Sequence, residues 1–190
     1  MTTNRSLRWR SGEGDALGLE HLELKIADSG IAAEAVVIGG AGEAAFGARW
    51  RITVDPDWTS TRSLHLTRLG GATVALRHDG YGEWSDGEGK KRKEFQGLSD
   101  CIVLGSPFGL TQIVKRLGAK AAKTQSLDVV AVTLPDLAIA RLTLKLEPIE
   151  AGRRLRLTVT ETVTEVEIDA EGLVVGFGEA VRRIGGGASA

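Results

Sequence analysis

Asp100 and Cys101 lie in a segment whose residue order suggests a reactive or ligand-binding group. The order Gly97-Leu98-Ser99-Asp100-Cys101 comes close to the G-x-S-x-G turn of a nucleophilic serine, but lacks the second glycine. A cysteine nucleophile needs a nearby histidine, which the sequence does not place, so we expect Cys101 to be buried and apolar in character. Asp100 or Asp79 could still serve as a general acid or base, because an apolar pocket raises the pKa of a carboxylate.

Histidines are the other residue type that could do chemistry here. His65 and His78 flank Gly70-Gly71, a two-residue hairpin signal, which predicts both on one face of the hairpin as diagonal neighbours. Two histidines could begin a metal site, but no third ligand has suitable spacing. We expect His21 to be held by hydrogen bonds within a strand. No metal and no other cofactor is predicted.

A glycine-rich stretch imitates a nucleotide-binding turn. Residues 35–45 read AVVIGGAGEAA, which places Gly40, Gly42 and Ala45 in a G-x-G-x-x-A pattern. That site needs a helix after the glycines, whose N-terminus would meet the pyrophosphate. Gly47 and the alternating residues 50–54 leave no room for one, so the stretch is expected to be a β-turn.

Two tryptophans and two charged residues are candidates for ligand contact. Trp58 follows Asp55-Pro56-Asp57 and Trp84 precedes Ser85-Asp86-Gly87, so each lies at a strand end. Such a ring either caps the core or packs on an acyl chain or sugar at a cavity mouth. Arg62 and Asp100 would then form an internal ion pair or bind a head group.

The middle of the chain is basic. Lys90-Lys91-Arg92-Lys93 is typical of a solvated loop, and its alternative role is contact with anionic lipid head groups. The net charge of −1 argues against non-specific nucleic-acid binding. No apolar run has the length of a signal peptide or a membrane span, and one cysteine permits no internal disulfide. A cytoplasmic location is expected.

The elements that must position these residues are strands. Apolar and polar residues alternate with a period of two, for example at 22–26, 50–54, 142–146 and 155–159. About a dozen strands can be drawn, with 25 glycines and only 4 prolines between them. One short helix is predicted over 107–117, with Ser106 as N-cap and Pro107 at its first position. The sequence predicts a single all-β domain over 1–184 and a disordered tail over 185–190.

Beyond these patterns, the order of motifs resembles a family of bacterial glycolipid-binding proteins, formerly a domain of unknown function. The segment 97–117 (GLSDCIVLGSPFGLTQIVKRL) is similar to the family pattern G-C-x-D-V-D-L-x-x-T-P-F-T-N-T-L-P-I-R-R-L. Matching residues also occur in order along nearly the whole chain: Trp9, Gly18-Leu19-Glu20-His21, Trp50-Arg51-Ile52, Asp55, Trp58, Arg62, Asp79-Gly80, Gly82, Trp84, Leu134-Pro135-Asp136-Leu137, Asp169, Gly172-Leu173-Val174 and Arg183.

The chain departs from the family pattern at four positions. Leu98, Ile102, Leu110 and Ile113 stand where the family has cysteine, aspartate, asparagine and proline. Any head-group contact made by those polar groups in relatives is therefore changed here.

The resemblance implies a spiral β-roll, a half-barrel similar to the periplasmic carriers of lipoproteins, holding a lipid or glycolipid in an apolar cavity without catalysis. The candidate ligand-binding residues are Trp58, Arg62, Asp79, Trp84, Asp100, Phe108 and Arg116. Two alternatives stay open: a small enzyme that uses Asp100 or Asp79, and a structural or oligomerising β module.

Overall fold

The computed structural model describes residues 2–188, except for the side chains of residues 119 and 186–188. Within this range it contains one α-helix, α1 (Pro107–Leu117), and fourteen strands that form a single sheet. The strands are β1 (Thr2–Ser11), β2 (Gly18–Ala27), β3 (Gly30–Gly39), β4 (Phe46–Val54), β5 (Thr61–Arg68), β6 (Thr73–His78), β7 (Trp84–Asp86), β8 (Cys101–Val103), β9 (Gln125–Val132), β10 (Ile139–Glu150), β11 (Arg154–Val159), β12 (Thr162–Ile168), β13 (Val174–Phe177) and β14 (Val181–Ala188). The predicted all-β fold with at most one short helix is confirmed.

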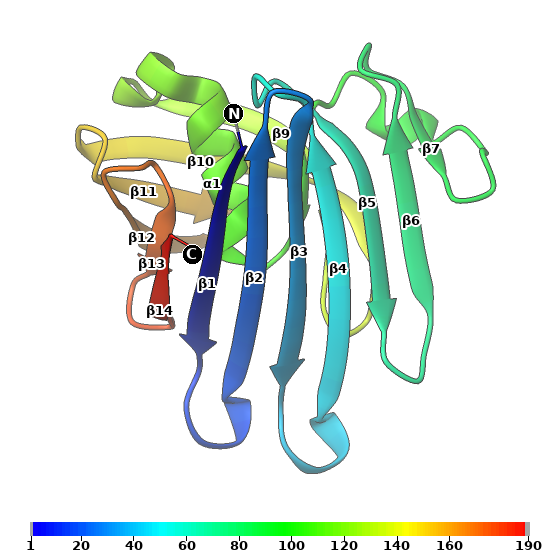
Figure 1. The fold of residues 1–190 in the computed structure, drawn as a ribbon, viewed down its shortest axis with the longest axis vertical. Helices are drawn as coiled ribbons and strands as arrows, with labels where there is room; N and C mark the ends of the chain where they lie inside the picture. The colour runs from blue at the N-terminus through cyan, green and yellow to red at the C-terminus, as the bar shows by residue number, and fades with distance from the viewer. Residues whose placement is uncertain (1, 189–190) are drawn as a thin grey trace.

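The sheet curls upon itself but does not close. Its order is β7-β6-β5-β4-β3-β2-β1-β14-β13-β12-β11-β10-β9-β8, so the first and last strands pair with each other and β7 and β8 form the edges. The strands of the second half run across behind the long strands of the first half (Figure 1). Neighbours pair antiparallel, apart from the parallel pair β8–β9.

Alternation along each strand builds the concave face of the first half. One cross-strand row joins Leu24, Ala33, Ile52, Leu64 and Leu76, and all five side chains are buried. Because successive side chains point to opposite faces, the intervening charged residues face outward.

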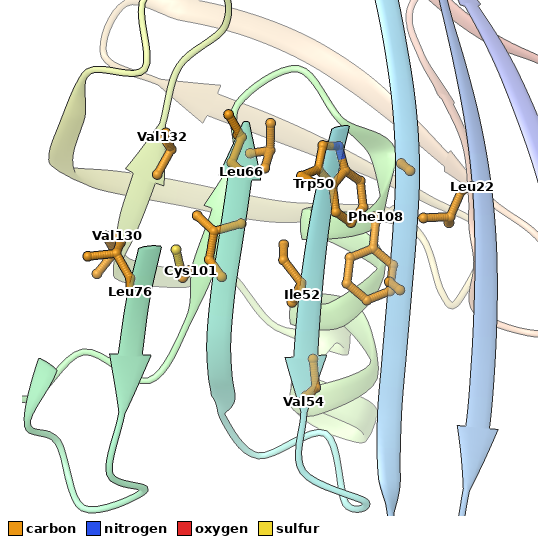
Figure 2. Packing of buried hydrophobic residues seen from close by; sticks show 14 of the residues in the cluster. Leu22, Trp50, Ile52, Val54, Leu66, Leu76, Cys101, Phe108, Val130 and Val132 are labelled. Atoms are coloured by element: carbon orange, nitrogen blue, oxygen red, sulfur yellow. The ribbon is translucent and has the colours of Figure 1, made fainter. Parts of the chain in front are cut away.

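The space inside the curl is filled largely by α1 and by β8–β9. Phe108 of α1 packs on Trp50 of β4, with ring centroids 5.8 Å apart (Figure 2). Val130 and Val132 of β9 also point toward the first half, whereas Val129 and Ala131 pack with the second half. The part of the concave side around Trp50 is therefore occupied by the protein's own side chains.

The helix begins and ends where the sequence predicts. The Ser106 hydroxyl accepts a hydrogen bond from the Phe108 backbone N–H at 3.4 Å, and Pro107 occupies the first turn, where its missing N–H costs nothing. Gly118, with φ 49°, ends the helix. Gly109 allows close packing, since a Cβ there would lie 2.7 Å from Ile102.

The glycine-rich stretch is a hairpin turn between β3 and β4, as expected. Gly40 and Gly42 have φ of 71° and 56°, which glycine adopts without strain. The β1–β2 turn repeats this geometry at Gly12 and Gly14, with φ of 61° and 54°. No nucleotide-binding helix follows either turn.

The prediction for the β5–β6 hairpin was wrong by one residue. His65 pairs with Ala75, and the turn spans three residues, 69–71, rather than two. A shift of one residue moves a side chain to the opposite face of a sheet. His65 is therefore exposed on the outside, while His78 is buried inside.

The C-terminal boundary also differs from the prediction. Residues 185–188 continue β14 and pair with β1, whereas 189 and 190 lie outside the described residues. Within the described range, no helix has the length and apolar character needed to cross a bilayer.

Candidate functional site

Two hollows adjoin at residues 103–106, the segment that joins β8 to α1. The larger, here called the apolar hollow, has a volume of about 370 Å³. The smaller, here called the glutamate hollow, has a volume of about 160 Å³. Both are lined in part by Val103, Leu104, Gly105 and Ser106, so one short segment borders two chemically different spaces.

The apolar hollow lies between the start of α1 and the second half of the sheet. Its walls come from β8, α1, β10, β11, β12 and β13, and its polar side chains are Ser106 and the threonines beside the β11–β12 turn. The remaining lining is mainly aliphatic and aromatic: Ile102, Val103, Leu104, Leu110, Leu144, Leu157, Val159 and Phe177. A volume above about 300 Å³ with such walls is typical of sites for small organic ligands.

Two of the departures from the family pattern line this space. Ile102 and Leu110 replace the aspartate and the asparagine of that pattern, and both face the apolar hollow. Leu98 and Ile113, the other two replacements, are buried in the core. The substitutions thus make the hollow more apolar.

The glutamate hollow contains one charged side chain, Glu20 of β2. The Ser106 hydroxyl donates a hydrogen bond to Glu20 Oε1 over 2.7 Å. Glu20 is only 8% exposed, and burial raises its pKa to about 7, an effect that the bond from Ser106 partly opposes. A carboxyl group with this pKa exchanges its proton near neutral pH.

Sequence reasoning did not select Glu20 or Ser106 as ligand-binding residues. The inward position of Glu20 could have been predicted, because the alternation that buries Leu22 and Leu24 continues back to Glu20 on the same face. Alternation could not identify the hydrogen-bond partner of Glu20, since Ser106 lies 86 positions away in the sequence.

Asp100 and Arg116, two predicted site residues, are brought together in a separate buried network. Arg116 Nη2 lies 2.6 Å from Asp100 Oδ2, and Arg116 Nε donates to Oδ1 over 3.2 Å. Gln112 donates from Nε2 to Asp100 Oδ1 at 3.0 Å and to the Thr61 hydroxyl at 2.6 Å. Burial raises the pKa of Asp100 despite the opposing effect of Arg116.

This network joins β5 to the edge strand β8. The Thr61 N–H donates to the Ser99 carbonyl at 2.9 Å, and the Thr61 hydroxyl accepts from the Cys101 N–H at 2.9 Å. Thr61 begins β5, whereas Cys101 begins the opposite edge strand β8. The roll is thus fastened between its edge strand β8 and β5, which lies inside the other edge.

Arg62 and Asp79 do not join that network. The predicted ion pair between Arg62 and Asp100 is not formed, because Asp100 faces inward to Arg116 while Arg62 is exposed over Gly80. Asp79 is exposed and accepts hydrogen bonds from the Tyr81 and Glu83 backbone N–H groups, which lower its pKa.

The predicted aromatic residues lie in the core or beside it. The Trp84 indole is buried, donates to the Leu98 carbonyl at 2.8 Å and stacks on His78 at 4.7 Å. Trp58 is half-buried, 6.3 Å from the Phe108 ring, with Lys115 Nζ 5.9 Å from its centroid. None of the seven predicted ligand-binding residues lines either hollow.

Histidine, cysteine and lysine side chains outside this network are the remaining candidates for chemistry. Among the described residues, no three His, Cys, Asp or Glu side chains are grouped so as to hold a metal ion. Cys101 is buried, as expected, and burial raises the pKa of its thiol. In the basic run, Lys91 pairs with Glu83 and Arg92 with Glu94, both at the surface.

Comparison with known proteins places the chain in a family. A family model with the description "Putative glycolipid-binding" matches residues 6–183. The fold is similar to that of a DUF1089 family protein from Pseudomonas aeruginosa, solved at 1.80 Å, with a TM-score of 0.75 and 22% identity over 93% of this chain and 95% of that one. A search of curated proteins found no match. Because the family model spans nearly the whole sequence, the chain belongs to the family described as putative glycolipid-binding.

Proposed function

We propose that the protein is a non-enzymatic carrier of an amphiphile. The alkyl chain occupies the apolar hollow, and the head group lies toward Glu20 in the adjoining glutamate hollow. The observation that carries the proposal is that residues 103–106 line both spaces, because an amphiphile needs apolar and polar environments side by side. The family description adds support for a glycolipid as the ligand.

Most of the affinity would come from burial of the alkyl chain. Each buried CH₂ group contributes about 0.8 kcal/mol, which corresponds to about a four-fold change in the dissociation constant. A homologous series of ligands should therefore bind about four-fold more tightly per added CH₂ until the apolar hollow is full.

A blocking variant tests the location of the chain. Val159→Trp places a large ring at the wall of the apolar hollow, from a half-buried position that can adjust more easily than the core. Val163→Trp is the matched control, because Val163 is 57% exposed on the next strand and lines neither hollow.

The measurements are native mass spectrometry, lipid extraction of the purified protein, and binding of alkyl ligands and a glycolipid panel. We expect Val159→Trp to weaken binding at least about ten-fold and Val163→Trp to leave it unchanged. Equal ligand affinity in the two variants would mean that the alkyl chain binds outside the apolar hollow. Failure of the native protein to bind any member of the panel would overturn the proposed function.

A further inference from the structure

The chemistry of the glutamate hollow says which head group it can take. Glu20 is its one charged lining residue, and the other side chains are apolar or aromatic apart from Ser11 and Ser106. Trp9 forms one wall, and its indole N–H is already used in a bond to the Val174 carbonyl at 3.3 Å. The hollow therefore offers a ligand one carboxylate, two hydroxyls and apolar surface.

Glu20 lacks the partners that a buried carboxylate usually has. Over residues 2–188, its one hydrogen bond is the bond from Ser106 to Oε1, and no lysine, arginine or histidine forms an ion pair with it. Asp100 shows the ordinary arrangement, with a two-point contact to Arg116 and a further bond from Gln112. Removing a carboxylate from water is costly unless a cation or several donors replace the water.

We infer that the glutamate hollow binds a protonated primary amine in the head group of the amphiphile. This inference rests on the proposed function, because the amine is carried on the chain that fills the apolar hollow. An ammonium supplies the missing positive charge and up to three N–H donors, for Glu20 and the hydroxyl of Ser106. A neutral hydroxyl leaves the charge of Glu20 uncompensated, and an anionic head group would be repelled by it.

Three ligands with one chain length separate these chemistries. Decylamine, 1-decanol and decanoate carry an ammonium, a hydroxyl and a carboxylate on the same number of carbon atoms. Their affinities are measured by calorimetry below the concentration at which they aggregate, with the native protein at pH 7.5. We expect decylamine to bind at least about ten-fold more tightly than 1-decanol, and decanoate to bind most weakly.

Glu20→Gln keeps the shape of the side chain but removes its charge. In this variant we expect decylamine and 1-decanol to bind within about two-fold of each other, because the charge that distinguishes them is gone. Glu23→Gln is the control, because Glu23 is an exposed residue of the same strand and should keep the preference for the amine. A preference for decylamine that survives Glu20→Gln would overturn the inference.

A measurement on the unmodified protein tests the inference even if the Glu20→Gln variant does not fold. Glu20 has a pKa of about 7, so it is about half protonated at pH 7, and a bound ammonium would ionise it. Binding of decylamine should then release about half a proton, seen as a binding enthalpy that depends on the ionisation enthalpy of the buffer. No proton release, or equal affinities for decylamine and 1-decanol, overturns the amine assignment alone. Absence of binding by all three ligands overturns the proposed function as well.

Discussion

Arg116 holds Asp100 by two contacts, with Nη2 2.6 Å from Oδ2 and Nε 3.2 Å from Oδ1. The Asp100 side chain is 1% exposed, whereas the Arg116 side chain is 24% exposed and reaches the surface. The pair is therefore a link from the inside of the roll to its exterior. Such two-point contacts depend on the planar guanidinium, which lysine cannot imitate.

Loss of this link should destabilise the protein strongly. Arg116→Ala leaves the Asp100 carboxylate buried without its cation, and we expect the free energy of unfolding in urea to fall by about 3 kcal/mol at pH 7. The loss should become smaller as the pH is lowered, because burial raises the pKa of Asp100 and so favours its neutral form. Arg141→Ala, which breaks the exposed pair with Asp128, is the control and should cost less than about 1 kcal/mol. Equal losses in the two variants would contradict a fastening role.

Stability should depend on pH through Glu20. Burial raises its pKa from 4.5 to about 7, so the native state binds this proton more tightly than the unfolded state. The contribution to stability is full below about pH 4.5 and is lost as the pH rises through 7. Between pH 5 and pH 8, we expect the free energy of unfolding to fall by about 2–3 kcal/mol more in the native protein than in Glu20→Gln. Parallel pH profiles for the two proteins would exclude this linkage.

The β11–β12 turn carries local strain. Thr160, which lines the apolar hollow, has φ 52°, and a β-branched residue rarely adopts a positive φ. Thr160→Gly should raise the free energy of unfolding by about 1 kcal/mol, measured by thermal and urea denaturation. Thr158→Gly, at a strand position of the same hairpin, should instead lower it by about 1 kcal/mol. A loss of stability in both variants would show that Thr160 is not strained.

Cys101 should report on unfolding of the whole domain. Its side chain is fully buried and burial raises the pKa of the thiol, so the reactive thiolate is scarce in the native state. A thiol reagent at pH 8 should label the protein only at the rate at which it unfolds, and at once in concentrated urea. Rapid labelling under native conditions would mean that the edge around β8 opens locally.

Much of the fold could be predicted because most strands have one face in the core and one in water. The alternation at 22–26, 50–54, 142–146 and 155–159 lies within β2, β4, β10 and β11. Strand β8 (CIV) and the C-terminal half of β9 (VVAV) do not show this pattern, because both of their faces are covered and their residues are all apolar. The predicted register of the β5–β6 hairpin was wrong for another reason, because its turn is longer than the sequence suggested.

The site was harder to predict than the fold. Residues chosen for their chemical types either find bonding partners inside the core, as Trp84 and Asp100 do, or stay at the surface like Arg62. The alternation of β2 indicates that Glu20 faces inward, but its hollow arises where β2 meets the segment before α1. A space formed between segments far apart in sequence leaves no local pattern.

The pairing of β1 with β14 has a consequence for synthesis. A growing chain can add β2 to β7 hairpin by hairpin, but the outer side of β1 stays unpaired until the last strand has left the ribosome. An unpaired strand can recruit foreign strands and aggregate. Arg5, Arg8 and Arg10 place positive charge along β1, and charge of this kind hinders edge-to-edge association. These arginines would hinder aggregation of the nascent chain during the time before β14 can pair with β1.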